Sequence, residues 1–150
     1  MKEPEKFRGN HPATVDVKGR LKIPAAFLSG LREQGSKFYV TSQKGDSARI
    51  YTMRKWEEIE SRLMRAGTYN KQRQKFLARA NYFGQEVGID SQGRVLIPAV
   101  LRAAAQLSGE VNVMGELEFL TIWNRARFLE NLNNEPPNVE DDKFLEELGI

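Results

Sequence analysis

The sequence predicts an α+β protein with a mostly β core, built from two similar halves that fold together as one pseudo-symmetric unit. A ten-residue stretch occurs twice, at 16–25 and 90–99, with Asp, Gly, Arg, Ile, Pro and Ala at the same places in both copies. Apolar residues alternate just before each copy, as they do in half-buried strands. Each half is about 50 residues long, too short to hold a sufficient core alone, so the two halves should share one.

Each copy of the repeat is expected to form a strand, a tight turn and a second strand. An Asp side chain can accept a hydrogen bond from the backbone two residues on, and Gly tolerates positive φ, so Asp16 with Gly19 and Asp90 with Gly93 favour turns. The strands are expected at 13–17 and 20–23 in the first copy, and at 85–89 and 94–97 in the second. An arginine begins the second strand in both copies.

A short helix is expected after each second strand. Pro24 and Pro98 lack the amide hydrogen that a strand ladder needs, but they suit the first position of a helix. The helices are expected at 25–31, ended by Gly30 or Gly35, and at 99–106, ended by Ser108 and Gly109.

Each half should continue with a hairpin and a second helix. The hairpin strands are expected at 38–41 and 49–52, and at 111–114 and 121–124. Thr52 and Asn124 follow as suitable N-caps, because their side-chain oxygens can accept a hydrogen bond from the first turn of a helix. Both halves therefore have the order strand, turn, strand, helix, hairpin, helix.

Helical spacing of apolar residues also predicts helices at 53–65 and 69–83, between the two repeats. The many lysines and arginines of these helices are interpreted as solvent-facing, with phosphate contact as the alternative. A short amphipathic helix is expected at 141–148, either docked or frayed. We divide the chain into a first repeat at 7–56, a helical inter-repeat segment at 57–82, a second repeat at 83–132 and an acidic tail at 133–150.

Composition bounds the class of protein. The chain has no cysteine, which excludes disulfides and thiol chemistry, and no apolar run approaches the ~20 residues that cross a bilayer. The N-terminus lacks a signal-peptide core, so we expect a cytoplasmic protein without membrane partners. The net charge of +3 combines −5 over 135–150 with +8 over the preceding 134 residues. A basic body of this kind is compatible with nucleic-acid binding, although a solvated charge asymmetry gives the same numbers.

Residues with catalytic chemistry are scarce. His11 is the single histidine, so we expect no Ser-His-Asp triad, and no second histidine or cysteine is there to share a metal. Asp16 and Asp90 could meet as paired carboxylates, but each is followed four residues later by an arginine that should neutralise it. We therefore expect no enzyme activity, no catalytic residue, no cofactor, no metal and no small-molecule substrate.

The turn with its flanking strands is better suited to recognition. A two-stranded ribbon fits the major groove of DNA, and arginine offers a bidentate fork to guanine or phosphate. Lys18, Arg20 and Lys22 cluster on the first hairpin, while Arg94 has fewer basic neighbours on the second. We therefore expect Arg20→Ala to weaken DNA binding more than Arg94→Ala. The alternative is structural: each arginine closes its turn by an ion pair with the aspartate.

Three motifs together resemble one family. Residues 7–9 read FRG, residues 16–24 read DVKGRLKIP and residues 90–98 read DSQGRVLIP. With Ile122-Trp123 after the second repeat, their order and spacing closely resemble the MraZ family of bacterial transcriptional regulators, which is associated with the division and cell-wall gene cluster. The resemblance covers about residues 7–132, and two copies of the motif are far more specific than one.

The resemblance implies more than the residues alone do. It implies AbrB-like swapped-hairpin halves packed as an intramolecular pseudo-dimeric barrel with flanking helices. It also implies self-assembly into a ring-shaped homo-oligomer, and binding to direct repeats in its own promoter, usually as a repressor. The Asp-x-x-x-Arg motif of the family maps onto Asp16 and Arg20, and onto Asp90 and Arg94.

We therefore expect a cytoplasmic, nucleoid-associated transcriptional regulator that binds double-stranded DNA. The candidate DNA-binding residues are Arg20, Lys18, Lys22, Arg94 and Arg8, with Asp16, Gly19, Asp90 and Gly93 shaping the turns. Two alternatives remain open: a ring-forming protein-interaction scaffold that has lost DNA binding, and an antitoxin-like regulator with the AbrB fold.

Overall fold

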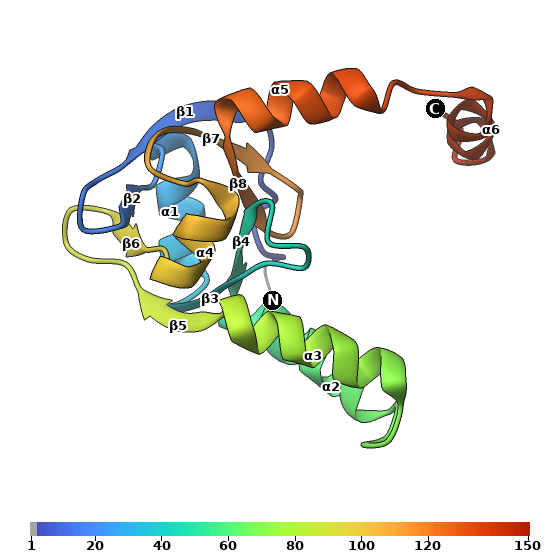
Figure 1. The fold of residues 1–150 in the computed structure, drawn as a ribbon, viewed down its shortest axis with the longest axis horizontal. Helices are drawn as coiled ribbons and strands as arrows, with labels where there is room; N and C mark the ends of the chain where they lie inside the picture. Colours follow the sequence, from blue (N-terminus) through green and yellow to red (C-terminus); the bar gives the residue numbers. More distant parts are fainter. Residues whose placement is uncertain (1–2) are drawn as a thin grey trace.

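The two halves of the chain have the same order of elements (Figure 1). The computed structural model describes residues 3–150. The first half contains β1 (Asn10–Val15), β2 (Arg20–Lys22), α1 (Ala25–Glu33), β3 (Lys37–Thr41), β4 (Ala48–Thr52) and α2 (Met53–Met64). After α3 (Lys71–Phe83), the second half contains β5 (Gln85–Gly88), β6 (Arg94–Leu96), α4 (Ala99–Ala105), β7 (Gly109–Gly115), β8 (Leu120–Asn124) and α5 (Arg125–Asn134). The chain ends with α6 (Val139–Glu147). The predicted order is confirmed.

The halves exchange strands. The described strands form one antiparallel sheet in the order β5-β3-β4-β8-β7-β1-β2-β6. In this sheet β1 of the first half pairs with β7 of the second, and β5 of the second half pairs with β3 of the first. The equivalent strands β2 and β6 pair with each other, as do β4 and β8. This pattern is that of a swapped-hairpin pseudo-dimer with an approximate two-fold axis, as expected.

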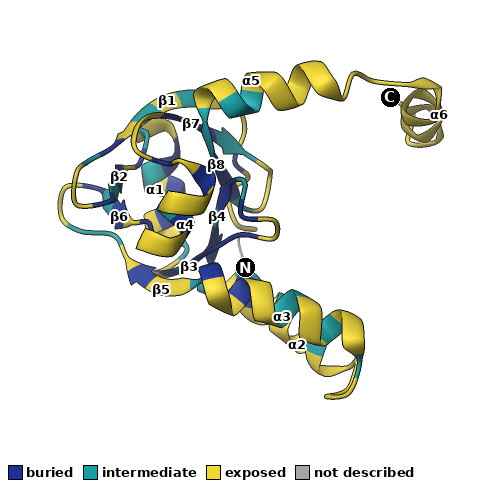
Figure 2. Cartoon of the chain, in the orientation of Figure 1, coloured by how far each residue is buried: buried dark blue, intermediate teal, exposed yellow. Residues whose placement is uncertain are grey.

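A bridge between Ile89 and Val95 joins the two ends of the strand order, so the sheet is nearly closed into a barrel. Closure matters because open sheet edges invite pairing with other chains. The interior is filled by alternating strand residues (Figure 2). Outward positions are exposed except where other elements cover them, as at Tyr51, which is 4% exposed and packs on Trp56 of α2. At the β2–β6 crossing, Leu21 and Val95 are Cα partners and both are 0% exposed. The mostly β core is therefore shared by the two halves.

Helix ends account for small differences from the expected boundaries. Gly30 lies buried inside α1, which instead ends at Glu33 before Gly35. The second short helix ends at Ala105, because Gln106 itself adopts a left-handed backbone with φ of 56°. Thr52 and Asn124 do cap α2 and α5 by accepting hydrogen bonds from the backbone amides of residues 55 and 127.

Two pairs of helices extend from the barrel (Figure 1). The α2–α3 pair is anchored by an aromatic cluster in which Trp56 stacks on Tyr39 at 4.5 Å between ring centroids and on Phe76 at 6.2 Å. The α5–α6 arm begins on β7 and β8, but α6 has no buried residue. Within residues 3–150, no helix has the length and apolar character needed to cross a membrane.

The N-terminal arm is held against the β7–β8 turn. Phe7 is 2% exposed, and its backbone exchanges two hydrogen bonds with Leu117, at 2.8 and 3.0 Å between nitrogen and oxygen. Gly115 permits this approach, because a Cβ atom there would lie 2.3 Å from the carbonyl carbon of Phe7. The buried Phe7 therefore holds the arm against the body of the protein.

We expect Gly115→Ala to lower the free energy of unfolding by about 1–3 kcal/mol, because the added methyl meets backbone that cannot rotate away. Urea denaturation followed by circular dichroism measures the change. The matched control is Gly88→Ala, where a Cβ would meet only the Ser36 carbonyl oxygen at 3.5 Å, an ordinary contact. Equal losses in the two variants would contradict the close approach at Gly115.

Candidate nucleic-acid interface

The first turn is organised by the side chain of Asp16. Its Oδ1 accepts hydrogen bonds from the backbone amides of Lys18 at 3.0 Å and Arg20 at 2.9 Å. The amide of Gly19 donates to the carbonyl oxygen of Asp16 at 2.9 Å, and Gly19 has φ of 87°. Glycine suits this position because other residues rarely adopt positive φ. The side chain and backbone of one aspartate therefore define the whole turn.

The second turn repeats this geometry. Asp90 Oδ1 accepts from the amides of Gln92 and Arg94, both at 2.9 Å. Gly93 donates to the Asp90 carbonyl oxygen at 3.0 Å and has φ of 76°. The predicted turn roles of Asp16, Gly19, Asp90 and Gly93 agree with this geometry.

Each aspartate also fixes the arginine of its turn. Arg20 Nε donates to Asp16 Oδ2, and Arg94 Nε donates to Asp90 Oδ2, both at 2.9 Å. The two arginine side chains remain 32% and 25% exposed. Among residues 3–150, neither guanidinium makes a hydrogen bond through its Nη atoms. The ion pair expected in the structural interpretation is therefore present, and it leaves the outer edge of each guanidinium available to a ligand.

Hydrogen bonds lower the pKa of both aspartates below the ordinary value of 3.8. The largest cause is the backbone amide of Arg20 for Asp16 and of Arg94 for Asp90, with the arginine side chains adding to it. Hydrogen bonds to the charged form of a carboxyl group favour that form. Both carboxylates are therefore ionised at neutral pH and keep their turns closed.

We expect a pH-dependent stability difference between the wild type and the Asp16→Asn/Asp90→Asn variant. Because the folded pKa values lie below the unfolded ones, the carboxylates stabilise the fold above pH ~4, and this contribution disappears as the pH falls through the folded values. Urea denaturation at pH 7, 5, 4 and 3 should show the wild type more stable at pH 7 and the difference shrinking toward pH 3. A difference that is constant with pH would show that ionisation of the aspartates is not its source.

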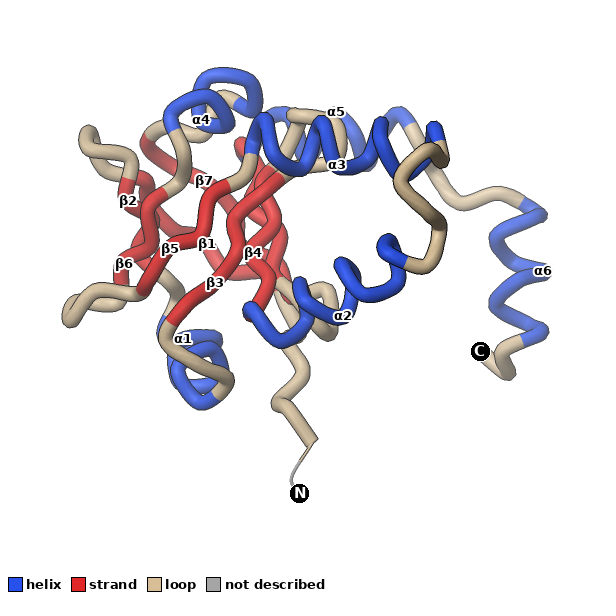
Figure 3. Tube along the Cα trace, turned by 90° about the horizontal axis from the view of Figure 1, so that it is seen from below, coloured by secondary structure: helices blue, strands red, loops and turns tan. Residues whose placement is uncertain are grey.

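The two turns brace each other across the pseudo-two-fold axis. The amide of Ile23 donates to the carbonyl oxygen of Gly93, and the amide of Ile97 donates to that of Gly19, both at 2.9 Å. Figures 1 and 3 show both turns at the same end of the molecule, away from α6. The structure thus brings the two copies of the turn together on one face.

Lys22 lies beside the second turn, not the first. The sequence places Lys22 with the first hairpin, but it is the Cα partner of Arg94, and its ammonium group contacts the carbonyl oxygen of Gln92 in the second turn. The reason is the strand exchange, which places β2 beside β6. Lys18 remains exposed in the first turn, as expected.

Two further cations lie beside the turns and were missed in the sequence. Arg32 on α1 donates through Nη2 to the carbonyl oxygen of Asp90 at 3.0 Å. The guanidinium of Arg102 on α4 lies directly over Gly19. A Cβ atom at residue 19 would be only 1.8 Å from Arg102 Nη1, so the contact requires glycine there. Both contacts cross between the halves, so local sequence patterns carry no signal for them.

With this correction each turn has three neighbouring cations, Lys18, Arg20 and Arg102 at the first and Lys22, Arg94 and Arg32 at the second. The expected asymmetry between Arg20 and Arg94 loses its basis, and the two turns are electrostatically similar.

Arg8 lies elsewhere. It is exposed, and its backbone sits against Gly115 at the β7–β8 turn, at the opposite end of β1 from Asp16. The six residues of β1, Asn10–Val15, lie between Arg8 and Asp16 and alone span roughly 20 Å at a strand rise of ~3.3 Å per residue. The structure does not bring Arg8 into the cluster at the turns, and we leave it out of the interface.

The fold and these turns together define a class of protein: tandem AbrB-like repeats in one chain, with a paired Asp-x-x-Gly-Arg turn. A family described as "MraZ protein, putative antitoxin-like" matches residues 7–79 and 84–143. The chain is 46% identical over 145 residues to the transcriptional regulator MraZ of Acidobacterium capsulatum, covering 96% of this chain and 99% of the relative. It is 47% identical over 146 residues to the protein of the same name from Koribacter versatilis, with 96% and 99% covered.

This chain belongs to the MraZ family.

Proposed function

We propose that this protein is a DNA-binding transcriptional regulator that acts as a repressor by binding direct repeats in its own promoter, within the division and cell-wall gene cluster. The observation that carries the proposal is the pair of braced turns, each presenting an oriented arginine. Its relatives are named transcriptional regulators, which supports the same class of function. Such a protein would be cytoplasmic and associated with the nucleoid.

The proposed contact follows from the geometry of the arginines. Asp16 and Asp90 hold the Nε edge of each guanidinium, so the Nη edge points outward without further loss of side-chain freedom. A guanidinium fork matches two acceptors on guanine or two oxygens of a phosphate. Lys18, Lys22 and the neighbouring cations would supply phosphate contacts, which give most of the affinity.

One protomer offers few base contacts, so specificity should require several protomers on repeated sites. We propose self-assembly into a ring, in which linked modules gain affinity without new contacts. All protomers of a ring would present their turns in equivalent positions, so direct repeats in phase with the ring would be bound together.

Fluorescence anisotropy tests this function. The probe is a labelled duplex carrying the DNA upstream of the gene for this chain, beside a shuffled duplex of the same composition, at about 150 mM salt. We expect tighter binding to the upstream duplex, and an affinity that falls linearly in log salt, because counterions are released from the phosphates. Equal, weak binding to both duplexes would contradict sequence-specific recognition and favour the scaffold alternative.

A further inference from the structure

The C-terminal helix α6 is formed but covered by nothing in its own chain. All residues of α6 are exposed, including Val139 at 69%, Phe144 at 59% and Leu145 at 39%, and so is the C-cap residue Leu148 at 59% (Figure 2). The helix begins with a capping box between Asn138 and Asp141. Isolated helices shorter than ~12–15 residues are marginal in water even for sequences of high helix propensity. Phe144 and Leu148, one helical turn apart, form a contiguous exposed apolar patch, and such patches mark contact surfaces. A nine-residue amphipathic helix therefore needs a partner surface.

α6 presents charge and apolar groups on the same side. Glu140, Phe144, Glu147 and Leu148 follow helical spacing along one face. Over Val139–Glu147 the helix carries five acidic residues and one lysine, a net charge of −4. The partner surface should therefore have an apolar centre and a basic rim.

One surface of this chain has that character. A hollow of about 230 Å³ lies on α3 and the β3–β4 loop, lined by Gln43, Gln72, Lys75, Phe76 and Arg79. Phe76 provides apolar surface there, and Lys75 and Arg79 are exposed beside it. α3 carries four cations and no acidic residue over Lys71–Phe83, a net charge of +4, which is equal and opposite to that of α6.

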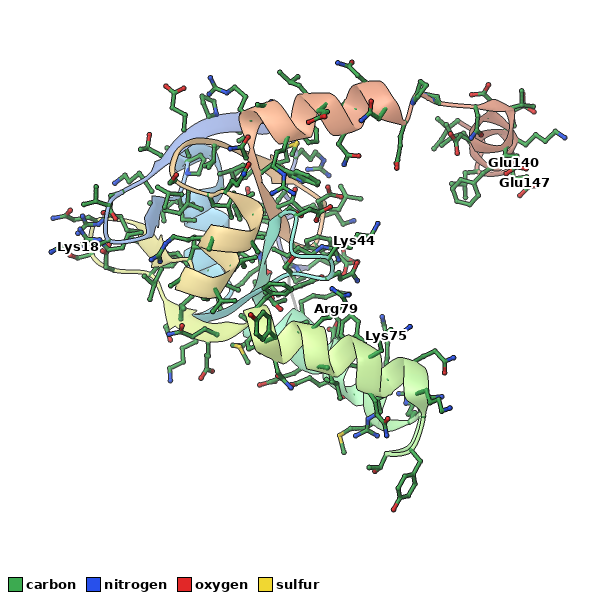
Figure 4. All side chains as sticks on the ribbon, in the orientation of Figure 1. Lys18, Lys44, Lys75, Arg79, Glu140 and Glu147 are labelled. Carbon is green, nitrogen blue, oxygen red and sulfur yellow. The ribbon has the colours of Figure 1, made fainter. Side chains whose placement is uncertain are left out.

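The basic rim is available and lies away from the proposed DNA contact. Among residues 3–150, Lys44, Lys75 and Arg79 make no ion pair. Figure 4 shows these three residues near the inner side of α3, and Lys18 of the first turn at the far end of the molecule. Docking of α6 on α3 would leave both turns free.

We propose that α6 of one protomer docks into the α3 hollow of a second copy of this chain. The apolar face of α6 would cover Phe76, and Glu140 and Glu147 would pair with Lys75 and Arg79. This rests on the proposed self-assembly and names its contact. Each copy carries one donor helix and one acceptor surface, so the contact is head-to-tail, and such contacts close into rings when the rotation allows it.

A second copy fits this contact better than the same chain does. The link between α5 and α6 spans only residues 135–138 and includes Pro136 and Pro137, whose φ angles are restricted. α5 is anchored on β7 and β8 and directs α6 away from the barrel (Figures 1 and 3). The acceptor surface lies on the other helical arm.

Charge-reversal variants of the full chain test the contact by mass photometry or native mass spectrometry. The acceptor variant is Lys75→Glu/Arg79→Glu and the donor variant is Glu140→Lys/Glu147→Lys. We expect the wild type to be larger than the 17.1 kDa protomer, and each variant alone to lose that assembly. Mixing the two variants should restore it, because each then meets a complementary partner.

The matched control variants reverse the same number of charges at positions outside the proposed contact. Asp142→Lys/Glu146→Lys lies on the opposite face of α6, and Arg54→Glu/Arg62→Glu lies on α2; both should keep the mass of the wild type. Circular dichroism must show every variant folded. A protomer mass for the wild type, wild-type mass for either reversal variant alone, or a mixture that stays at 17.1 kDa would overturn the proposal. The last result would mean that Glu140 and Glu147 do not face Lys75 and Arg79 across the contact. Because the measured quantity is mass, these outcomes are independent of DNA binding.

Discussion

The Arg20→Ala/Arg94→Ala variant is expected to bind the upstream duplex more than about 100-fold more weakly than the wild type. A bidentate arginine contact contributes about 1–3 kcal/mol, which corresponds to about fivefold to about 140-fold per site. The two single variants should lose similar amounts of DNA affinity, because three cations surround each turn. Fluorescence anisotropy at fixed salt measures all three affinities.

The control for this prediction is Arg54→Ala/Arg62→Ala, which removes the same charge from exposed positions on α2. It should change the affinity only slightly, since long-range attraction is screened over about 8 Å at physiological salt. Equal losses in the control and in the turn variant would mean that net charge alone drives binding. A large loss from Arg20→Ala with none from Arg94→Ala would contradict the two-turn interface.

The largest expected effect on stability is that of Leu21→Ala. Leu21 is 0% exposed at the crossing of β2 and β6, where it is the Cα partner of Val95. Truncating a fully buried leucine removes apolar contacts and leaves a cavity, at a cost of about 2–5 kcal/mol. Urea denaturation should show this loss as a lower midpoint.

Leu96→Ala provides the comparison on the same ladder. Leu96 is 37% exposed on the outward side of β6, so its truncation leaves no enclosed cavity, and we expect a loss well below that of Leu21→Ala. A larger loss from Leu96→Ala would contradict the assignment of inner and outer faces at this crossing.

The repeat made much of the fold predictable from the sequence. Asp, Gly and Pro have strong local preferences, so the turns at Gly19 and Gly93 and the helices after Pro24 and Pro98 follow from a few residues. Their equal spacing in two copies then predicted a pseudo-two-fold arrangement. The caps Thr52 and Asn124 were predictable for the same local reason.

The strand exchange limited what could be predicted about the site. Lys22 was grouped with its sequence neighbours, yet it lies beside Arg94, 72 positions later, because β2 pairs with β6. Arg32 and Arg102 reach turns of the opposite half, so no local pattern indicated them. The termination of α4 also escaped prediction, because Gln106 rather than a glycine adopts the left-handed conformation.

The most direct test of the proposed interface is photo-crosslinking from single cysteines, which the cysteine-free chain makes possible. Val17→Cys and Ser91→Cys place an aryl azide at equivalent exposed positions of the two turns, and Ala78→Cys places it on the basic helix α3. We expect crosslinks to the upstream duplex from both turns and none from α3. Crosslinks from α3 alone, or from neither turn, would contradict the central claim that the paired turns contact DNA.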